Sequence, residues 1–258
     1  MEGDLKNHLR WCNTCEVPLL RDNCEICGNK GAKICSDLKP MFEDECKILE
    51  LSTGRQMPGE GWQTGLWMRN KTIWFQGKKL IRVSSNGKPV IAKEYLTPPW
   101  GSYSGNNVTS ETLHRANQSA LRELEEQAVC FVQEIVRMHP KRKPVVSFSG
   151  GKDSIVVSYI VRKALQTDEI LHIFSNTTIE YPDTTDYIAT FKRNNPDIPF
   201  YEGTNNHSFL QMCGILGPPS MLNAWCCSVF KARPIAEAVN SVKSKEGVIS
   251  FEGIRRKS

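Results

Sequence analysis

Residues 149–154, with the sequence SGGKDS, directly follow the apolar run PVVSF. All six are candidates for binding the phosphates of a nucleotide: Ser149, Gly150, Gly151, Lys152, Asp153 and Ser154. A Gly-rich turn between a strand and a helix leaves backbone N–H groups free at the helix N-terminus, where the macrodipole favours an anion. The glycines let the backbone approach phosphate oxygens, the lysine adds a charge, the serines add donors and the aspartate could help to hold Mg²⁺. Because Val146 and Asp153 stand where a Walker A loop needs Gly and Ser or Thr, this is a different kind of phosphate-binding loop.

Four cysteines near the N-terminus have the spacing of a metal site: Cys12, Cys15, Cys24 and Cys27. Each Cys-x2-Cys pair forms a tight knuckle that presents two thiolates, and two knuckles make a closed tetrahedral site typical of structural zinc. The surrounding segment is too polar to bury a core of its own, so the metal would supply most of its folding free energy. We therefore expect Zn²⁺ here, with iron or a redox-active dithiol as the alternatives.

The residues ahead of the phosphate-binding loop divide into a predicted zinc ribbon, residues 1–46, and a small β module with a linker, residues 47–108. The module holds short β-type runs such as TIWFQ and LIRVS, with turn signals at Gln76-Gly77 and Asn86-Gly87. Its linker is rich in Pro, Gly, Ser and Asn. Three tryptophans are expected to pack in the core of the module, with base stacking as the alternative: Trp62, Trp67 and Trp74.

The third predicted domain, residues 109–258, contains the phosphate-binding loop. Apolar residues recur every three or four positions over residues 110–138, which predicts one amphipathic helix. Beyond it, strands are expected at 144–148, 169–175, 198–201 and 247–252. Helices are expected at 153–165, 182–193, 207–213 and 232–243. This alternation, with near-continuous apolar strands, predicts an α/β fold with a mostly parallel sheet and helices on both faces.

Several stretches of this domain resemble a known superfamily. SGGKDS resembles the pyrophosphate-binding loop of the adenine-nucleotide α-hydrolase (PP-loop) superfamily, which includes ATP pyrophosphatases, tRNA thiolation enzymes and the phosphoadenosine phosphosulfate (PAPS) and adenosine phosphosulfate (APS) reductases. HIFSNTTIEYPDTTDYIATF, residues 172–191, is similar to the second strand, nucleotide-facing loop and helix of the reductases. WCCSVFKARPIAEAV, residues 225–239, resembles their Trp-Cys-Cys-x-x-x-Lys-x-x-Pro segment, and GVISFEGIRRKS, residues 247–258, resembles their strand and Gly-x-Arg-Arg segment.

The resemblance gives roles to further residues. Asn176 and Thr177 would contact the nucleotide, although this chain has Asn176 and Thr178 where the reductases often show Asp-Thr-Gly. Cys226 and Cys227 would be ligands of a [4Fe–4S] cluster, which needs thiolates, with two structural cysteines as the alternative. Four basic residues would neutralise the phosphosulfate and form the catalytic group: Lys152, Lys231, Arg255 and Arg256.

The activity implied by the resemblance is the reduction of PAPS or APS to sulfite and an adenosine phosphate, as in sulfate assimilation, with a thioredoxin-like protein as reductant. In the family a second cysteine pair completes the cluster and a late cysteine attacks the sulfur. No cysteine follows Cys227 here, so we expect a fragment of a longer reductase, with a protein that is not a complete reductase by itself as the alternative. Two alternatives stay open: an ATP pyrophosphatase of the same superfamily that uses Mg²⁺ and acts on tRNA or DNA in thiolation or phosphorothioation, and a non-catalytic nucleotide-sensing module.

The composition limits the setting in which the protein acts. The net charge of +5 suits an anionic ligand without requiring nucleic acid. No apolar run approaches the roughly 18 residues of a membrane span, and the N-terminus is charged where a signal peptide would be apolar. We therefore expect a cytoplasmic protein without a membrane partner, and the sequence leaves a homo-oligomer open. His172 stands in no ligand spacing and is expected to be structural.

Overall fold

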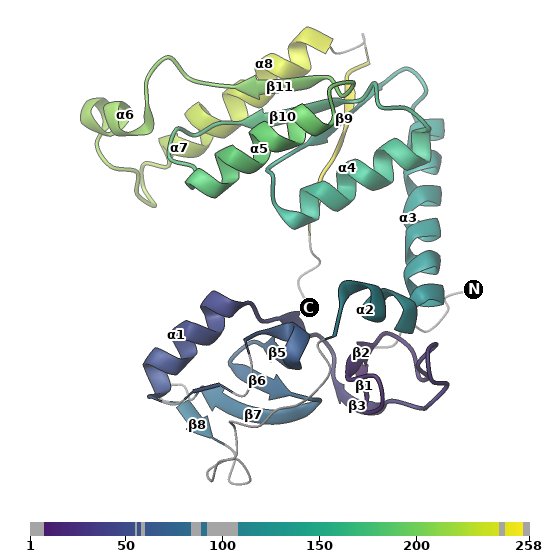
Figure 1. The fold of residues 1–258 in the computed structure, drawn as a ribbon. Helices are drawn as coiled ribbons and strands as arrows, with labels where there is room; N and C mark the ends of the chain where they lie inside the picture. The colour runs from purple at the N-terminus through teal and green to yellow at the C-terminus, as the bar shows by residue number, and fades with distance from the viewer. Residues whose placement is uncertain are drawn as a thin grey trace. The chain divides into compact units, whose positions relative to one another are not determined.

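The computed structural model describes residues 8–54, 56–57, 60–83, 89–91, 108–242 and 246–254. The chain divides into two compact units, Met1–Leu124 and Glu125–Ser258, which we describe separately (Figure 1). The domain boundaries predicted at residues 46 and 108 both fall within the first unit and stay predictions.

The N-terminal part of the first unit is a three-stranded antiparallel sheet with the strand order β2-β1-β3. Its strands are β1 (Leu9–Cys12), β2 (Val17–Leu19) and β3 (Ala32–Cys35). Each Cys-x2-Cys pair lies in a tight turn beside these strands. In the first turn the N–H of Glu16 donates to the C=O of Cys12 at 2.8 Å, and in the second the N–H of Gly28 donates to the C=O of Cys24 at 2.8 Å. The two knuckles predicted from the spacing are therefore present.

A five-stranded antiparallel sheet with the order β4-β5-β6-β7-β8 forms the rest of this unit's β-structure. Its strands are β4 (Lys39–Pro40), β5 (Leu66–Arg69), β6 (Thr72–Phe75), β7 (Lys78–Val83) and β8 (Pro89–Ile91). Gln76 and Gly77 turn the chain between β6 and β7 with φ of 47° and 76°, the left-handed values that a tight hairpin requires. The predicted antiparallel module is confirmed, while the turn signal at 86–87 lies outside the described residues.

One helix of this unit, α1 (Glu43–Thr53), was not predicted from the sequence. At its start the Glu45 carboxylate accepts a hydrogen bond from the N–H of the N-cap residue at 2.9 Å, and at its end Gly54 adopts a left-handed φ of 66°. Cys46 and Leu49 pack the helix against the apolar residues of one sheet face. On the other face a second core holds the buried side chains Trp11, Trp67 and Trp74, with Trp62 partly buried beside them. Core packing of the tryptophans is therefore confirmed.

The single helix predicted over residues 110–138 is two helices, α2 (Ser110–Ala116) and α3 (Gln118–Met138), which meet at Asn117. Asn117 is buried, and its side-chain amide accepts from the N–H of Leu20 at 2.7 Å and donates to the C=O of Pro18 at 3.0 Å. These bonds tie the break between the helices to the end of β2. The prediction of one continuous helix was wrong because this tertiary contact leaves no mark on the helical periodicity.

The second unit contains a four-stranded, fully parallel sheet with the order β11-β10-β9-β12. Its strands are β9 (Lys143–Ser147), β10 (Leu171–Ser175), β11 (Phe200–Gly203) and β12 (Val248–Phe251). Its helices are α4 (Lys152–Leu165), α5 (Pro182–Asn194), α6 (Phe209–Leu216), α7 (Trp225–Cys227), a π-helical segment (Ser228–Ala232) and α8 (Arg233–Val242). Every predicted strand of this domain is present, with boundaries within about two residues of the prediction.

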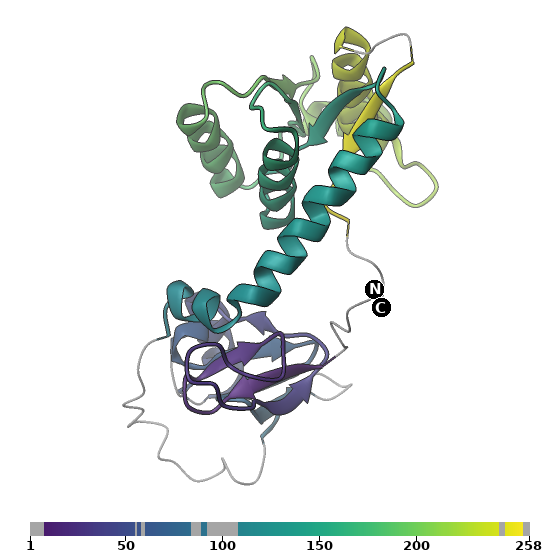
Figure 2. The same cartoon turned by 90° about the vertical axis from the view of Figure 1, so that its right-hand side faces the viewer.

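Helices cover both faces of this sheet (Figures 1 and 2). On one face Val146 packs in a core with residues of α4, α5 and the C-terminal half of α3, and on the other Val145 packs against Ala238 of α8. Because neighbouring residues of a strand point to opposite faces, both valines of β9 are buried. The predicted α/β fold class is confirmed.

His172 of β10 is fully buried between these layers. Its Nδ1 lies 2.7 Å from the C=O of Ile170 and its Nε2 lies 2.8 Å from the hydroxyl of Ser158. Both ring nitrogens have partners, so the prediction of a structural histidine is confirmed. No helix in the described part of the chain is long and apolar enough to cross a membrane.

Candidate functional site

The carboxyl ends of β9, β10 and β12 lie next to one another at one edge of the parallel sheet. From β9 the chain first adds β10 and β11 on one side and later adds β12 on the other side, so the order of strands reverses at β9. In open α/β sheets, ligands bind outside the carboxyl ends of the strands at this switch point. The topology of the sheet therefore predicts a ligand site at the end of β9 and in the loop that follows it, over residues 147–154.

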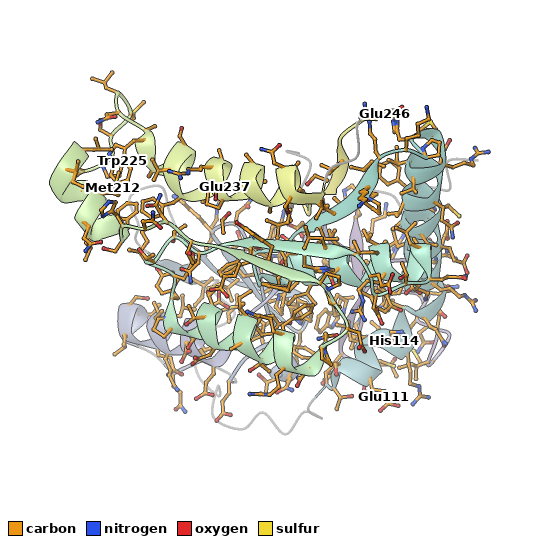
Figure 3. All side chains as sticks on the ribbon, turned by 90° about the horizontal axis from the view of Figure 1, so that it is seen from above. Glu111, His114, Met212, Trp225, Glu237 and Glu246 are labelled. Atoms are coloured by element: carbon orange, nitrogen blue, oxygen red, sulfur yellow. The ribbon has the colours of Figure 1, made fainter. Side chains whose placement is uncertain are left out.

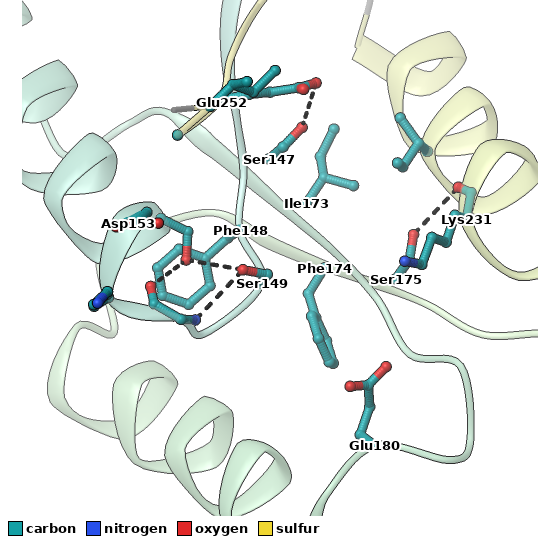
Figure 4. A pocket seen from close by; sticks show the side chains of 16 residues that line it. Ser147, Phe148, Ser149, Asp153, Ile173, Phe174, Ser175, Glu180, Lys231 and Glu252 are labelled. Carbon is teal, nitrogen blue, oxygen red and sulfur yellow. Dashed lines mark hydrogen bonds between the residues drawn. The ribbon is translucent and has the colours of Figure 1, made fainter. Parts of the chain in front are cut away.

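A cavity of about 500 Å³ lies at this position, within the range of roughly 300–1,000 Å³ typical of small-ligand sites (Figure 4). The loop after β9 and the start of α4 form one wall of the cavity. The segment after β12 forms a second wall, and Lys231 of the π-helical segment and Ile235 of α8 form a third. The polar and charged side chains that line it are Ser147, Ser149, Lys152, Asp153, Ser154, Ser175, Glu180, Lys231 and Glu252. Phe148, Ile173, Phe174, Ile235 and Ile254 supply apolar surface. This combination suits a ligand with a flat apolar part and a charged part.

The loop between β9 and α4 has the geometry of an anion-binding turn. Gly150 adopts a left-handed φ of 74°, and a Cβ there would also lie 3.1 Å from Ile188. Gly151 is the N-cap of α4 and offers no side chain to bond the first amides of the helix. Those amides have no acceptor within the helix, because the first N–H groups of any α-helix lack one. The hydroxyl of Ser154 donates to the C=O of Gly151 at 2.8 Å and fixes the turn.

Gly253 brings the segment after β12 against the start of α4. A Cβ at this position would lie 3.0 Å from the Cβ of Asp153 and 3.1 Å from both its carbonyl carbon and oxygen. Contacts this short are tighter than most real Cβ contacts, so a larger residue fits here only if the neighbouring backbone moves by a few tenths of an ångström. The packing sets the distance between the phosphate-binding loop and the opposite wall of the cavity.

The cavity contains charges of both signs. Lys152 and Lys231 are its described cations, and Asp153, Glu180 and Glu252 are its carboxylates. The carboxylate of Glu252 accepts a hydrogen bond from the hydroxyl of Ser147 at 3.2 Å, across the ends of β12 and β9 (Figure 4). The hydroxyl of Ser175 donates to the C=O of Lys231 at 3.4 Å, which ties the π-helical segment to the end of β10. An anionic ligand would meet the loop amides and Lys152 at one wall and Lys231 at another, with carboxylates close to both.

The structure brings six of the predicted residues together around this cavity: Ser149, Gly151, Lys152, Asp153, Ser154 and Lys231. Gly150 shapes the loop without lining the cavity. Asn176 and Thr177 do not line it either, since the amide of Asn176 donates to Glu202 at 3.0 Å and the hydroxyl of Thr177 to Glu180 at 2.6 Å. Arg255 and Arg256 lie outside the described residues.

Four polar residues that line the cavity were not predicted from the sequence: Ser147, Ser175, Glu180 and Glu252. Ser147 and Ser175 could have been predicted, because they lie near the carboxyl ends of two strands that were expected to be parallel, and such ends line the ligand crevice. Glu252 follows β12, so its prediction would have required knowledge of the strand order, in which β12 lies next to β9. No sequence signal marks Glu180.

Cys226 and Cys227 lie in the short helix α7, away from the lining of the cavity. Cys226 is half-buried and Cys227 exposed, and the neighbouring Trp225 is buried against Phe209 with its indole N–H donating to the C=O of Gly217 at 3.0 Å. Figure 3 shows Trp225 and Met212 at the same end of this unit, opposite Glu246. The described residues place no third cysteine, histidine or carboxylate with this pair. Two thiolates are half of the set that a [4Fe–4S] cluster requires, so the described residues do not form a complete cluster site.

The four cysteines of the first unit do form a complete ligand set. The sulfurs of Cys12, Cys15, Cys24 and Cys27 all lie within 4.8 Å of one another, and those of Cys12 and Cys27 are 3.5 Å apart. Tetrahedral zinc with Zn–S bonds of about 2.3 Å separates its sulfurs by roughly 3.8 Å, so the spacing fits.

Burial raises the pKa of the Cys12 and Cys15 thiols. A backbone hydrogen bond at Asn29 lowers the pKa of Cys27 to about 7. A bound cation would stabilise the thiolate forms of these cysteines and displace their protons into water. The cluster can therefore hold a metal ion.

Comparisons with known proteins agree with this geometry. Residues 143–258 match the family model described as the phosphoadenosine phosphosulfate reductase domain. An uncharacterized protein of Methanocaldococcus jannaschii is 30% identical over 145 residues, which cover 55% of this chain and 33% of that protein. A second uncharacterized protein of the same organism is 29% identical over an alignment of 361 residues, covering 97% of this chain and 74% of its own length. The chain thus spans a third of the first relative and about three quarters of the second.

Two solved structures also resemble part of the chain. A phosphoadenylyl-sulfate reductase from Candida auris, in complex with phosphate, is 19% identical with a TM-score of 0.36, over 55% of this chain and 70% of that one. An NH3-dependent NAD synthetase from Campylobacter jejuni, in complex with nitrate, is 12% identical with a TM-score of 0.39, over 52% of this chain and 56% of that one.

Proposed function

We propose that the protein binds an adenine sulfonucleotide, PAPS or APS, and takes part in its reduction to sulfite, because residues 143–258 match the model of the phosphoadenosine phosphosulfate reductase domain. In this proposal the phosphosulfate lies against the loop 149–154, and the adenosine occupies the apolar part of the cavity. The family match supports the substrate class. The loop at the mouth of the cavity, with its helix N-terminus and Lys152, supports the position of the phosphosulfate.

In the proposed reaction a thiol attacks the sulfur, and the residues of this chain bind the substrate and stabilise its charge. A cysteine thiolate supplied from outside this chain attacks the sulfur, and the sulfur–oxygen bond to the phosphate breaks with its electron pair going to the phosphate oxygen. A thiosulfonate forms and the adenosine phosphate leaves. A dithiol reductant of the thioredoxin class attacks the cysteine sulfur, releases sulfite and ends as a disulfide. Two thiols are oxidised as hexavalent sulfur becomes tetravalent.

The residues of this chain act on the charge that develops during sulfur transfer. Negative charge grows on the phosphate oxygen as the sulfur leaves, and donors fixed in place before the reaction stabilise such charge most effectively. The loop amides and Lys152 are in position to supply this stabilisation, and Lys231, on another wall, would contact the sulfate oxygens. Arg255 and Arg256, which immediately follow the described cavity residues 252–254 in sequence, would complete the clamp with bidentate contacts. In nucleotide binding, Asn176 and Thr177 would act by positioning the segment around Glu180.

The observation that carries this proposal is the match of residues 143–258 to the reductase domain with its SGGKDS loop at the wall of a nucleotide-sized cavity. Titration calorimetry of the anaerobic protein with PAPS, APS and ATP tests it. We expect a phosphosulfate to bind at least tenfold more tightly than ATP, and the ratio of PAPS to APS affinity to reveal whether the 3′-phosphate is recognised. Tighter binding of ATP would overturn the reductase assignment.

A specific observation favours a second candidate, an ATP pyrophosphatase that adenylates tRNA or DNA for thiolation or phosphorothioation. Three carboxylates, Asp153, Glu180 and Glu252, line the cavity beside two lysines. Mg²⁺ is typically held by one or two carboxylates together with substrate phosphates. Under this candidate, ATP binding requires Mg²⁺ and pyrophosphate is released when RNA or DNA is added. Release that depends on neither addition would contradict it.

For the cysteine cluster of the first unit we propose zinc in a structural role. Cys12, Cys15, Cys24 and Cys27 would hold the ion with four thiolates, which leaves no open position for a substrate. Bound zinc would supply folding free energy to the ribbon, whose three strands are only three or four residues long.

A further inference from the structure

The basic residues of the first unit are concentrated in one stretch of the sequence. Residues 61–93 contain seven lysines and arginines and no aspartate or glutamate, although the whole chain carries a net charge of only +5. This stretch includes β5, β6 and β7, the central strands of the five-stranded sheet. This stretch of sequence therefore carries a larger net positive charge than the chain as a whole.

The register of the strands places three of these cations on one face. Arg69 of β5 is paired with Thr72 of β6, and Thr72 is paired with Arg82 of β7. Directly paired residues of an antiparallel sheet point to the same side, so Arg69 and Arg82 lie on one face, roughly 10 Å apart across two strand spacings. Lys79 is paired with Trp74 on this face, and its Nζ lies 5.5 Å above the Trp74 ring. We call Arg69, Lys79 and Arg82 the cationic row.

The cationic row has no acidic partner. Within the described residues, no carboxylate oxygen lies within 4 Å of these three side chains, whereas Lys47 and Lys163 each pair with a glutamate. Lys79 and Arg82 are exposed and Arg69 is half-exposed. The Cys35 thiol lies in the field of Arg69 and Lys79, and also of Asp37, the acidic group on this side. Unpaired like charges repel each other, and an anionic partner would relieve this repulsion.

Three acidic residues lie together over the opposite face of the sheet. Helix α1 carries Glu43, Asp44 and Glu45 in its first turn, and Cys46 and Leu49 pack it against the face that bears Leu66 and Ile73. The sheet is therefore polarised, with an acidic helix over one face and the cationic row on the other. Lys78 is paired with Phe75, which packs on the α1 side, so it lies outside the row on a neighbouring position of the same strand.

We propose that the cationic row binds the phosphate backbone of a nucleic acid. The cations come from two strands, β5 and β7, on either side of β6, and this spacing suits an extended polyanion with repeated phosphates. Long basic side chains that neutralise phosphates release condensed counterions, and this release provides sequence-independent affinity. The proposal does not depend on which nucleotide the second unit binds.

The test is fluorescence anisotropy of the full chain with a labelled RNA hairpin and a labelled DNA duplex, from 50 to 200 mM KCl. The variant Arg69→Gln, Lys79→Gln, Arg82→Gln removes the row. Each phosphate contact contributes about 0.9 to the slope of log affinity against log salt on a duplex, so three contacts contribute roughly 2.7. We expect the slope to fall by about 2–3 and the affinity to fall at least tenfold, with circular dichroism and zinc content unchanged. Binding to RNA, DNA or both identifies the natural polymer.

A matched control removes the same net charge elsewhere: Lys47→Gln, Lys78→Gln, Lys163→Gln. We expect its affinity and salt slope to stay within about twofold of the original protein. Equal weakening of both triple variants would show an effect of net charge alone and overturn the proposal. It would also be overturned if neither polymer binds, or if the row is needed only for binding vesicles that contain phosphatidylserine.

Discussion

The contact between Gly253 and the start of α4 makes Gly253→Ala a sensitive probe of the site. The added methyl group would lie 3.0–3.1 Å from the Cβ, carbonyl carbon and carbonyl oxygen of Asp153. Two of these atoms belong to the backbone, so no change of rotamer relieves the contact. Either the segment after β12 or the first turn of α4 has to move by several tenths of an ångström.

The size of the effect follows from this geometry. Inserting a methyl group into a packed contact costs about 1–3 kcal/mol, which lowers the melting temperature of a unit of this size by roughly 3–10 °C. The same movement misplaces the amides that face the phosphate. A hydrogen bond to a charged group contributes about 1.5–3 kcal/mol, so the loss of one raises the Kd for the nucleotide roughly 10- to 150-fold.

Differential scanning calorimetry and nucleotide titration measure the two effects, and Gly214→Ala is the matched control. Gly214 lies within α6 and a Cβ there meets no atom within 4 Å, so the same chemical change is expected to leave affinity unchanged and stability equal or about 0.5–1 kcal/mol higher. If Gly253→Ala behaves like Gly214→Ala in both assays, the packing of β12 against the phosphate-binding loop is refuted.

Three further predictions concern a charge, a metal and a buried histidine. Lys152→Ala removes a cation from the cavity wall and is expected to abolish measurable nucleotide binding with an unchanged circular dichroism spectrum; an unaltered Kd would remove Lys152 from the site. Mass spectrometry of the native protein is expected to find one zinc per chain, lost in Cys15→Ser but kept in Cys46→Ser, whose thiol is buried outside the cluster; a metal-free native protein that melts normally contradicts a structural ion. Burial lowers the pKa of His172 from its usual 6.5, so the unfolded chain takes up this proton at higher pH than the folded one. The contribution of His172 to the free energy of unfolding is therefore complete above about pH 6.5 and is lost as the pH falls through the folded pKa, by up to about 1.4 kcal/mol per pH unit. In denaturant unfolding, we expect the free energy of unfolding of His172→Asn to depend less on pH between pH 7 and 5 than that of the original protein. An equal slope in both proteins would rule out this histidine as the cause.

The parallel-sheet unit could be read from the sequence because each of its elements carries its own local signal. Apolar strands, Pro182 at the first turn of α5 and the glycines after β9 all agree with the tertiary arrangement. The first unit gave weaker signals. Helix α1 was missed because its apolar residues do not share one face: Cys46 and Leu49 pack against the sheet, whereas Ile48 and Leu51 are exposed. Its ends are set by Glu45 and Gly54.

The residues of the candidate site that are adjacent in the sequence could be predicted from it. Those that join the site only because two distant strands pair could not. The six-residue loop was found from its composition. Glu252 and Gly253 became part of the site only because β12 pairs with β9, more than a hundred residues away in the chain. The side chains of Asn176 and Thr177 were expected at the nucleotide, and their bonds to Glu202 and Glu180 depend on how the segment after β10 folds back.

The most direct test of the account is hydrogen–deuterium exchange measured by mass spectrometry, with and without saturating PAPS. If the phosphosulfate binds at the loop 149–154, exchange slows in peptides that contain the amides of residues 150–155 and in those that contain residues 252–254, with no change over residues 8–54. Protection confined to other parts of the chain, or none at a concentration that saturates binding, would contradict the assignment of the phosphosulfate to this loop.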